Sequence, residues 1–260
     1  MRRTLDILAL RHRATLTAFA DARVLLAFDF DGTLAPIVPV PARARMRATT
    51  RRLLGEAARR YPLAVVSGRA LPDVSARVRG IPLQVVFGNH GLEHTAARAV
   101  PSRRVAGWVA SLRAALRGWP GVVIEDKGRS VAIHYRHAHD RARARRAIEV
   151  AAGTLRGARV MGGLEAVNLL PGRAVHKGTA LRRALTICRC DRAIYVGDEH
   201  TDEDAFTALA SGRLLGIRVG ASRETRARFH LRSQAEVDEL LRLLIELGPA
   251  PARGPRLGRC

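Results

Sequence analysis

Short apolar runs alternate along the chain with longer segments in which apolar residues recur at helical spacing. The apolar runs end abruptly at polar residues, as at Phe28, where four apolar residues lead directly into an aspartate. Such runs are typical of buried strands in a parallel sheet. Strands are predicted at 25–28, 62–66, 83–87, 193–196 and 213–219, and helices at 47–60, 71–79, 177–187 and 234–246. The pattern therefore predicts an α/β fold, with a parallel sheet flanked by helices.

The alternation changes character in the middle of the chain. Helical patterns at 102–117 and 139–153 are each followed by a pair of strand-like runs, which turn around Lys127-Gly128 and Gly162-Gly163. This α-β-β-α-β-β order predicts a separate small α+β domain. The predicted divisions are a first core segment at 1–100, the small domain at 101–172, a second core segment at 173–247 and a disordered tail at 248–260.

The first predicted strand runs into Asp29, Asp31 and Gly32. In open α/β sheets, ligands bind at the carboxyl ends of the strands. If the strand continues, the two aspartates point the same way. Such a pair can hold a hard cation such as Mg²⁺, or one carboxylate can attack an electrophile while the other moves protons. An acidic turn after the strand is the simpler alternative.

Other predicted strands also end in polar groups that suit phosphate and metal chemistry. The second strand leads into Ser67-Gly68-Arg69, whose hydroxyl, backbone N–H groups and guanidinium suit phosphate oxygens. A Ser-Gly turn would explain the same residues. The strand at 193–196 leads into five carboxylates within residues 198–204. A bound divalent cation would offset their repulsion, and a helix N-terminus would also favour acidic residues there.

The formal net charge of +22 raises the question of nucleic-acid binding. The basic residues are spread along the chain and only 4% of residues are aromatic, so no platform for base stacking is visible. We therefore expect no nucleic-acid partner, although the charge should attract anionic substrates. Of the 45 basic residues only Lys127 and Lys177 are lysines, and a compact ammonium is not interchangeable with a guanidinium at a tight site.

Several classes of protein are disfavoured by the sequence. No apolar run approaches the ~18 residues of a transmembrane helix, so no membrane partner is expected. The N-terminal stretch carries Asp6 and Arg11 and is too short for a secretory signal. Three cysteines supply neither a disulfide framework nor two pairs of metal ligands. These features predict a cytoplasmic protein, and a monomer is expected.

The motifs resemble those of the trehalose-6-phosphate phosphatases, a family of the haloacid dehalogenase (HAD) superfamily. The residues that carry this resemblance are DFDGT at 29–33, SGR at 67–69, GNHGLE at 88–93, EDKGRSVAIHYR at 125–136, HKGTAL at 176–181 and GD-x-x-TDEDAF at 197–206. The resemblance covers roughly residues 24–220 and implies a HAD-like Rossmannoid core with a type-2 cap. It also implies a Mg²⁺-dependent reaction on a sugar phosphate.

The resemblance implies a role for each matched residue. Asp29 would be the nucleophile, Asp31 the general acid and base, and Ser67 and Lys177 the groups that neutralise the phosphoryl oxygens. The metal set would be Asp29, Asp31 through its carbonyl, Asp198 and the nearby Asp202. Substrate-binding residues would be Gly32, Arg69, Asn89, His90, Glu125, Lys127, Ser130, His134, Arg136 and Asn168.

Two residues depart from the family pattern. Glu199 follows Asp198 where the family usually has a second aspartate. Asn168 occupies a position where the family commonly has a glutamate that would accept hydrogen bonds from sugar hydroxyls. Because asparagine is neutral and also donates, this difference predicts weaker trehalose 6-phosphate binding or a shifted sugar preference.

Three functions are compared on this basis. The favoured one is hydrolysis of trehalose 6-phosphate in trehalose biosynthesis, with functional coupling to a separate trehalose-phosphate synthase. The second is a related HAD phosphatase for sucrose 6-phosphate, a glucosylglycerol phosphate or a mannosyl-phosphoglycerate. The third is a non-catalytic sensor or nucleic-acid binder, which the presence of Asp29, Asp31, Lys177 and Asp198 disfavours.

Overall fold

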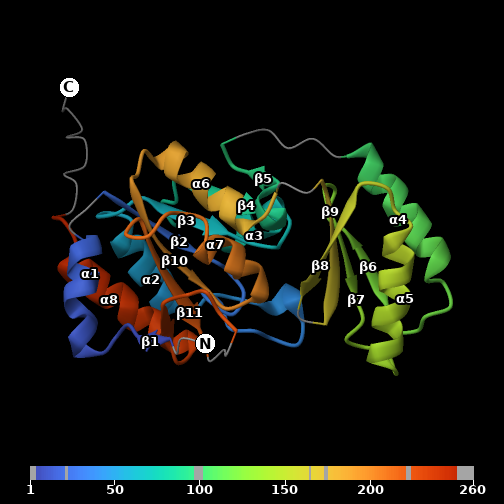
Figure 1. Cartoon of the computed structure of the whole chain (residues 1–260), viewed down its shortest axis with the longest axis horizontal. Coiled ribbons are helices and arrows are strands. Elements are labelled where there is room, and N and C mark those ends of the chain that lie inside the picture. The colour runs from blue at the N-terminus through green and yellow to red at the C-terminus, as the bar shows by residue number, and fades with distance from the viewer. Residues whose placement is uncertain are drawn as a thin grey trace.

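The computed structural model describes residues 4–20, 23–96, 102–163, 165–172, 175–220 and 224–250. Within these residues, eight strands form one sheet in the order β1-β12-β11-β10-β2-β3-β4-β5 (Figure 1). Their bounds are β1 Leu5–Asp6, β2 Val24–Phe28, β3 Leu63–Val66, β4 Val85–Gly88, β5 Glu93–His94, β10 Arg192–Gly197, β11 Leu214–Val219 and β12 Phe229–Leu231. Every pairing is parallel except that of β4 with β5, which is antiparallel. The predicted α/β core is confirmed.

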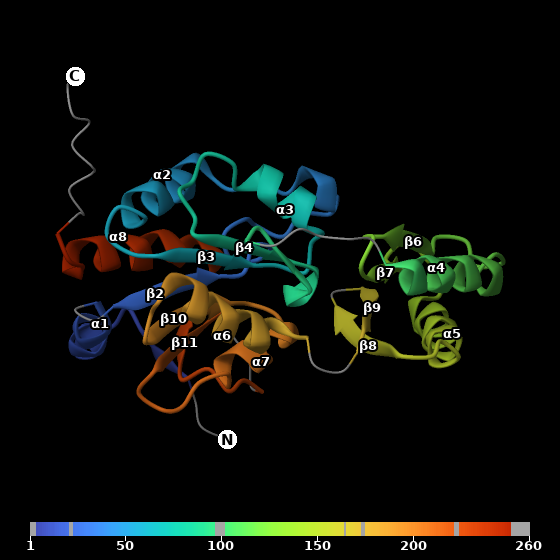
Figure 2. The same ribbon diagram turned by 90° about the horizontal axis from the view of Figure 1, so that it is seen from above.

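Helices cover both faces of this sheet (Figure 2). Strand β2 shows why, because Leu25 and Ala27 face one layer of helices while Leu26 and Phe28 face the other, and all four are buried. The first layer contains α6 (Lys177–Cys188) and α7 (Glu203–Phe206). The second contains α1 (Arg13–Ala20), α2 (Ala48–Ala57), α3 (Leu71–Arg77) and α8 (Val237–Leu247).

A second, antiparallel sheet lies beyond the carboxyl ends of the core strands (Figure 1). We call it, with its two helices, the cap. Its strand order is β6-β7-β9-β8, with bounds β6 Val123–Asp126, β7 Val131–His134, β8 Ala158–Gly163 and β9 Ala166–Pro171. Helices α4 (Arg103–Ala115) and α5 (Arg141–Gly153) pack on the face that points away from the main sheet (Figure 1). The other face of the cap is therefore turned toward the carboxyl ends of the core strands.

Some details differ from the sequence-based prediction. The turn predicted at Gly162-Gly163 is wrong, since β8 extends through both glycines and Glu165, with φ 51°, takes the left-handed conformation beyond them. Helix α1 and strands β1, β5 and β12 were not predicted. The tail predicted to be disordered lies outside the described residues from 251 onward. Among the described residues, no helix is both long and apolar enough to cross a membrane.

Candidate active site

The candidate site lies where β2, β3, β4 and β10 end, beneath the cap. Lys177, the first residue of α6, is at its centre, with its side chain 1% exposed. Its Nζ lies 2.8 Å from Asp202 Oδ1 and 3.1 Å from Asp29 Oδ2. Burial disfavours the ammonium form, but the Asp202 and Asp29 carboxylates outweigh burial and hold the pKa of Lys177 well above its usual value. Lys177 is therefore a permanent cation between two carboxylates.

Carboxylates crowd this part of the site. Oxygens of Asp29, Asp198 and Asp202 all lie within 4.8 Å of one another. Burial is the main reason that the pKa of Asp29 lies well above its usual value; Lys177 opposes this rise, and Asp202 adds to it. Burial, and then repulsion from Asp202 and Glu199, raises the pKa of Asp198 to about 7. Lys177 alone thus does not balance this charge, and a set of hard carboxylate oxygens fits a divalent cation such as Mg²⁺.

Two glycines allow the carboxylates to approach so closely. Gly32 has φ +76°, and a Cβ there would lie 2.0 Å from Asp198 Oδ2. A Cβ on Gly197 would lie 2.3 Å from the carboxyl carbon of Asp202. Strand β2 has already stopped at Phe28, and Gly32 turns the chain four residues later. The glycines of the DGT and GD motifs therefore have a steric function.

Asp29 and Asp31 face different partners, because the strand does not continue between them. Arg69 Nε donates to Asp31 Oδ2 at 2.7 Å, and Arg69 Nη2 donates to Asp31 Oδ1 at 2.6 Å. Arg69 also donates from Nη1 to Asp73 Oδ2 at 2.7 Å. The side chain of Asp31 is thus held by a bidentate ion pair, whereas that of Asp29 faces Lys177.

The loop after β3 lies against the loop after β4. Ser67 is fully buried, its Oγ accepts from the Arg69 N–H at 3.1 Å, and its carbonyl accepts from the His90 N–H at 2.9 Å. Asn89 and His90 both have positive φ, 50° and 56°. A Cβ on Gly68 would lie 2.6 Å from His90 Cε1, so glycine is required for this contact. Neither ring nitrogen of the buried His90 finds a hydrogen-bond partner within the described residues.

The turn between β6 and β7 of the cap contacts these loops directly. Lys127 Nζ donates to the Gly68 carbonyl at 2.9 Å, and Ser130 Oγ donates to Asn89 Oδ1 at 2.6 Å. Asn89 Nδ2 in turn donates to Glu93 Oε2 at 2.7 Å. Burial lowers the pKa of Lys127. The two predicted cap residues Lys127 and Ser130 thus meet the predicted core residue Asn89.

The other predicted substrate residues of the cap contact residues of the cap, and Arg136 also reaches the core. His134 Nε2 lies 2.9 Å from Glu125 Oε2, and this hydrogen bond lowers the pKa of Glu125. Arg136 donates to Glu165 Oε2 at 2.6 Å and to the Pro39 carbonyl at 3.0 Å. Asn168 is half-buried in β9, paired with a residue of β7 and one of β8.

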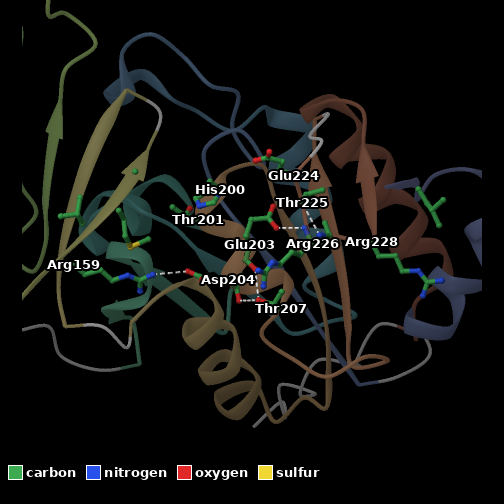
Figure 3. Close-up of a pocket in the computed structure, with 15 residues that line it drawn as sticks. Arg159, His200, Thr201, Glu203, Asp204, Thr207, Glu224, Thr225, Arg226 and Arg228 are labelled. Atoms are coloured by element: carbon green, nitrogen blue, oxygen red, sulfur yellow. Dashed lines mark hydrogen bonds and ion pairs between the residues drawn. The ribbon is translucent and has the colours of Figure 1, made fainter. Parts of the chain in front are cut away.

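Two residues that contact the site, Tyr195 and Arg218, were not predicted from the sequence. Tyr195 OH donates to Asp202 Oδ1 at 2.6 Å, and Arg218 Nη2 donates to the Asp198 carbonyl at 2.6 Å. Both contacts depend on how the chain folds after β10, so no periodic pattern in the sequence indicates them. A cleft of about 1250 Å³ opens between β8 on one side and the segments 200–207, which include α7, and 224–228 on the other (Figure 3). Across it Arg159 Nη2 lies 3.8 Å from Asp204 Oδ2.

Comparison with known proteins gives concordant matches. The trehalose-phosphatase family model matches residues 27–235. The trehalose-phosphate phosphatase of Mycobacterium marinum is 40% identical over 232 residues, which cover 82% of this chain and 59% of that protein. The protein of the same name from Mycobacterium tuberculosis is 38% identical over 247 residues, covering 87% and 62%. The chain thus spans about three fifths of the length of these relatives.

Solved structures agree with these matches. A trehalose-6-phosphate phosphatase related protein is 26% identical with a TM-score of 0.69, covering 86% of this chain and 97% of its own. The Aspergillus fumigatus trehalose-6-phosphate phosphatase is 26% identical with a TM-score of 0.64, covering 95% and 99%. The Candida albicans C-terminal domain, at 23% identity and a TM-score of 0.77, shares the fold over 95% of this chain and 100% of that one. From the family match over most of its length, this chain belongs to the trehalose-phosphatase family.

Proposed function

We propose that the protein is a Mg²⁺-dependent phosphatase that hydrolyses trehalose 6-phosphate to trehalose and inorganic phosphate. The observation that carries the proposal is the position of Lys177 between Asp29 and Asp202, with Asp198 close by. A buried carboxylate beside a permanent cation, at the end of a central strand, suits the attack of a carboxylate on phosphorus. The names of the mycobacterial relatives, trehalose-phosphate phosphatases, point to the same reaction.

The reaction divides into two displacements at phosphorus. A carboxylate oxygen of Asp29 attacks phosphorus, the bond to the sugar oxygen breaks, and Asp31 donates its proton to that oxygen. Water then attacks the phosphorus of the aspartyl phosphate, Asp31 takes a proton from it, and Asp29 is released with inorganic phosphate. Arg69 occupies one lone pair of each Asp31 oxygen, so a remaining lone pair can carry the proton while Arg69 keeps the carboxyl group oriented.

Phosphoryl transfer is catalysed mainly by positioning and by neutralising charge. Lys177 and the Ser67 hydroxyl would bind the non-bridging oxygens, and the N–H groups of the loop after β3 would add further donors. Asp29, Asp198 and Asp202 would hold Mg²⁺, together with the Asp31 carbonyl. When bound, the ion supplies positive charge next to the transferring phosphoryl group.

The sugar would be recognised from the cap. Glu125, Lys127, Ser130, His134 and Arg136 offer carboxylate, ammonium, hydroxyl, imidazole and guanidinium groups, which suit a molecule whose hydroxyls both donate and accept. Asn168 would complete this set, with Asn89 and His90 on the core side. Such a site requires the cap to open for the substrate and to close over it, which also excludes water.

The test is phosphate release with Mg²⁺ from trehalose 6-phosphate, sucrose 6-phosphate, glucose 6-phosphate and an aryl phosphate. We expect kcat/KM for trehalose 6-phosphate to exceed the others by about a hundredfold, roughly 2.7 kcal/mol of transition-state discrimination. Turnover of the aryl phosphate without this preference would support the proposed chemistry but overturn the proposed substrate. The same preparation, run on a sizing column, tests the proposed monomer.

A further inference from the structure

We infer that Arg159 and Asp204 form a closing contact between cap and core, and that this contact positions Lys177 when the cap closes over the substrate. The inference rests on the function proposed above and deepens it. It makes Arg159 and Asp204 positioning residues, which act on the phosphoryl group through Lys177 without touching it. Three features of the structure support it.

The first feature is the place of the ion pair. Arg159 belongs to β8, the edge strand of the cap sheet, and Asp204 belongs to α7 of the core. Arg159 Nη2 and Asp204 Oδ2 lie 3.8 Å apart across the cleft, and the two side chains are 30% and 37% exposed (Figure 3). Arg159 Nη1 also donates to the Val175 carbonyl at 3.4 Å, just before α6 begins. Arg159 therefore reaches from the cap toward both α7 and the start of α6.

The second feature is the packing of Asp204 against the first turn of α6. Asp204 Oδ2 lies 3.6 Å from Nδ1 of His176, and a Cβ on Gly178 would lie 2.2 Å from the Asp204 carbonyl oxygen. Lys177 stands between His176 and Gly178 in the chain. A displacement of Asp204 would therefore move the backbone on both sides of Lys177, because the Asp204 carbonyl lies directly against Gly178 and its carboxylate lies close to His176.

The third feature is the unequal strength of the contacts that tie the cap to the core. On the side of β6 and β7 the contacts are hydrogen bonds of 2.9 Å from Lys127 and 2.6 Å from Ser130. On the side of β8 the contacts are longer, with the ion pair at 3.8 Å and the hydrogen bond from Arg159 to the Val175 carbonyl at 3.4 Å, and they border an open cleft. Closure over a substrate therefore has room to proceed on the β8 side, where it would shorten the ion pair and strengthen it as water leaves.

A double-mutant cycle tests this contact. The variants are Arg159→Gln, Asp204→Asn and the double variant, each assayed with trehalose 6-phosphate and with an aryl phosphate too small to contact the cap. Each single variant should lower kcat/KM for trehalose 6-phosphate about fivefold, which is near the upper limit for a partly exposed ion pair. The kcat/KM of the double variant should fall no further than that of the more impaired single variant. Turnover of the aryl phosphate should stay within about twofold of wild type, since it does not draw the cap closed.

The matched control is Arg156→Gln, which removes the same charge from an exposed residue just before β8 and should behave as wild type. Three results would overturn the inference: single variants that match wild type, losses that multiply in the double variant, or equal losses with both substrates. If Asp204→Asn lowers the melting temperature, Arg159→Gln alone decides, because its side chain is partly exposed. Failure of the wild type to hydrolyse trehalose 6-phosphate would instead overturn the proposed function itself.

Discussion

Arg69 and Asp31 form a bidentate ion pair in which both oxygens of the Asp31 carboxylate accept a hydrogen bond, at 2.6 and 2.7 Å. The Arg69 side chain is 11% exposed and that of Asp31 is 35% exposed, so the guanidinium is largely buried while the carboxylate stays partly open to water. A charge-assisted fork of this kind fixes the direction of a carboxylate as well as its charge. Arg69 thus governs where the proposed acid and base of the reaction points, and the two residues come from the ends of adjacent strands.

Replacing Arg69 by glutamine should lower kcat/KM for trehalose 6-phosphate by about 30-fold or more, because Asp31 loses its orientation and a buried partner. Steady-state kinetics measure this loss. Arg77→Gln is the matched control, since Arg77 pairs with Asp73, as Arg69 does, without contacting Asp31. Equal losses in the two variants would mean that the Asp73 network, and not Asp31, is what Arg69 supports.

The pair between Lys177 and its two carboxylates predicts a large stability effect. Lys177→Met leaves Asp29 and Asp202 buried without their cation, which should cost about 3–5 kcal/mol of unfolding free energy at neutral pH. Urea unfolding followed by circular dichroism measures the difference. The loss should shrink at pH 5, where Asp29, whose pKa is raised, takes up a proton more readily. A variant as stable as wild type at pH 7 would argue against the buried charge pair.

Asp29→Asn tests the proposed covalent step. Asparagine keeps the shape of the side chain but is a far weaker nucleophile, so turnover should fall below about a thousandth of the wild-type rate. Phosphate release under saturating substrate measures it. The variant should still bind substrate in equilibrium measurements. Residual turnover well above that level would indicate that water attacks the phosphorus directly.

The alternation of apolar runs was enough to predict the α/β core, because each run is a local signal that ends where a strand ends. Strand β5 was missed because its two residues, Glu93 and His94, are too few to show a periodic pattern. Its pairing with β4 also depends on a turn through Asn89 and His90, which both have positive φ. The two-residue strand β1 was missed in the same way, because its parallel pairing with β12 joins residues more than 200 positions apart.

The motifs name the residues of the proposed site, but its geometry could not be predicted from them. Asp29 and Asp198 lie near each other because they follow β2 and β10, which are neighbours in the sheet and end at the same edge, and Lys177 reaches Asp29 from the first turn of α6. That Asp31 turns toward Arg69 instead could not be predicted, since it depends on where β2 stops and on the turn at Gly32. Contacts between cap and core, such as Ser130 with Asn89, depend on how the two layers meet.

Because the carboxylates of the site are crowded, we expect Mg²⁺ to stabilise the protein to a degree that depends on pH. The pKa of Asp198 is about 7 in the folded protein and near 3.8 in the unfolded chain. The folded state therefore holds this proton more tightly, and the stability that it contributes is full below pH ~4 and lost as the pH rises to ~7. Metal-free protein should thus lose stability over this range, and Mg²⁺ should raise the melting temperature more at pH 7.5 than at pH 5.

Thermal unfolding of EDTA-treated protein, with and without added Mg²⁺, measures this effect. Asp198→Asn is the control, because it removes the titrating group and one proposed metal ligand together, so both the pH dependence and the response to Mg²⁺ should diminish. Activity lost in EDTA should return when Mg²⁺ is restored. A melting temperature that responds to Mg²⁺ equally at both pH values would contradict the role given to Asp198.

Asn168 gives the last prediction, which concerns substrate preference. The residue is half-buried in β9, and its β-sheet partners are Ala132 and Met161, neither of which carries a charge. A glutamate there would accept hydrogen bonds from sugar hydroxyls without donating any, and a charged acceptor strengthens such bonds. Asn168→Glu should therefore raise kcat/KM for trehalose 6-phosphate by about fivefold to tenfold, mainly through a lower KM, while turnover of an aryl phosphate stays unchanged. Asn168→Gln keeps the longer side chain without the charge and serves as the control. If both variants leave kcat/KM for trehalose 6-phosphate as it is, the asparagine has no part in sugar recognition, and the preference must be set by other residues of the cap.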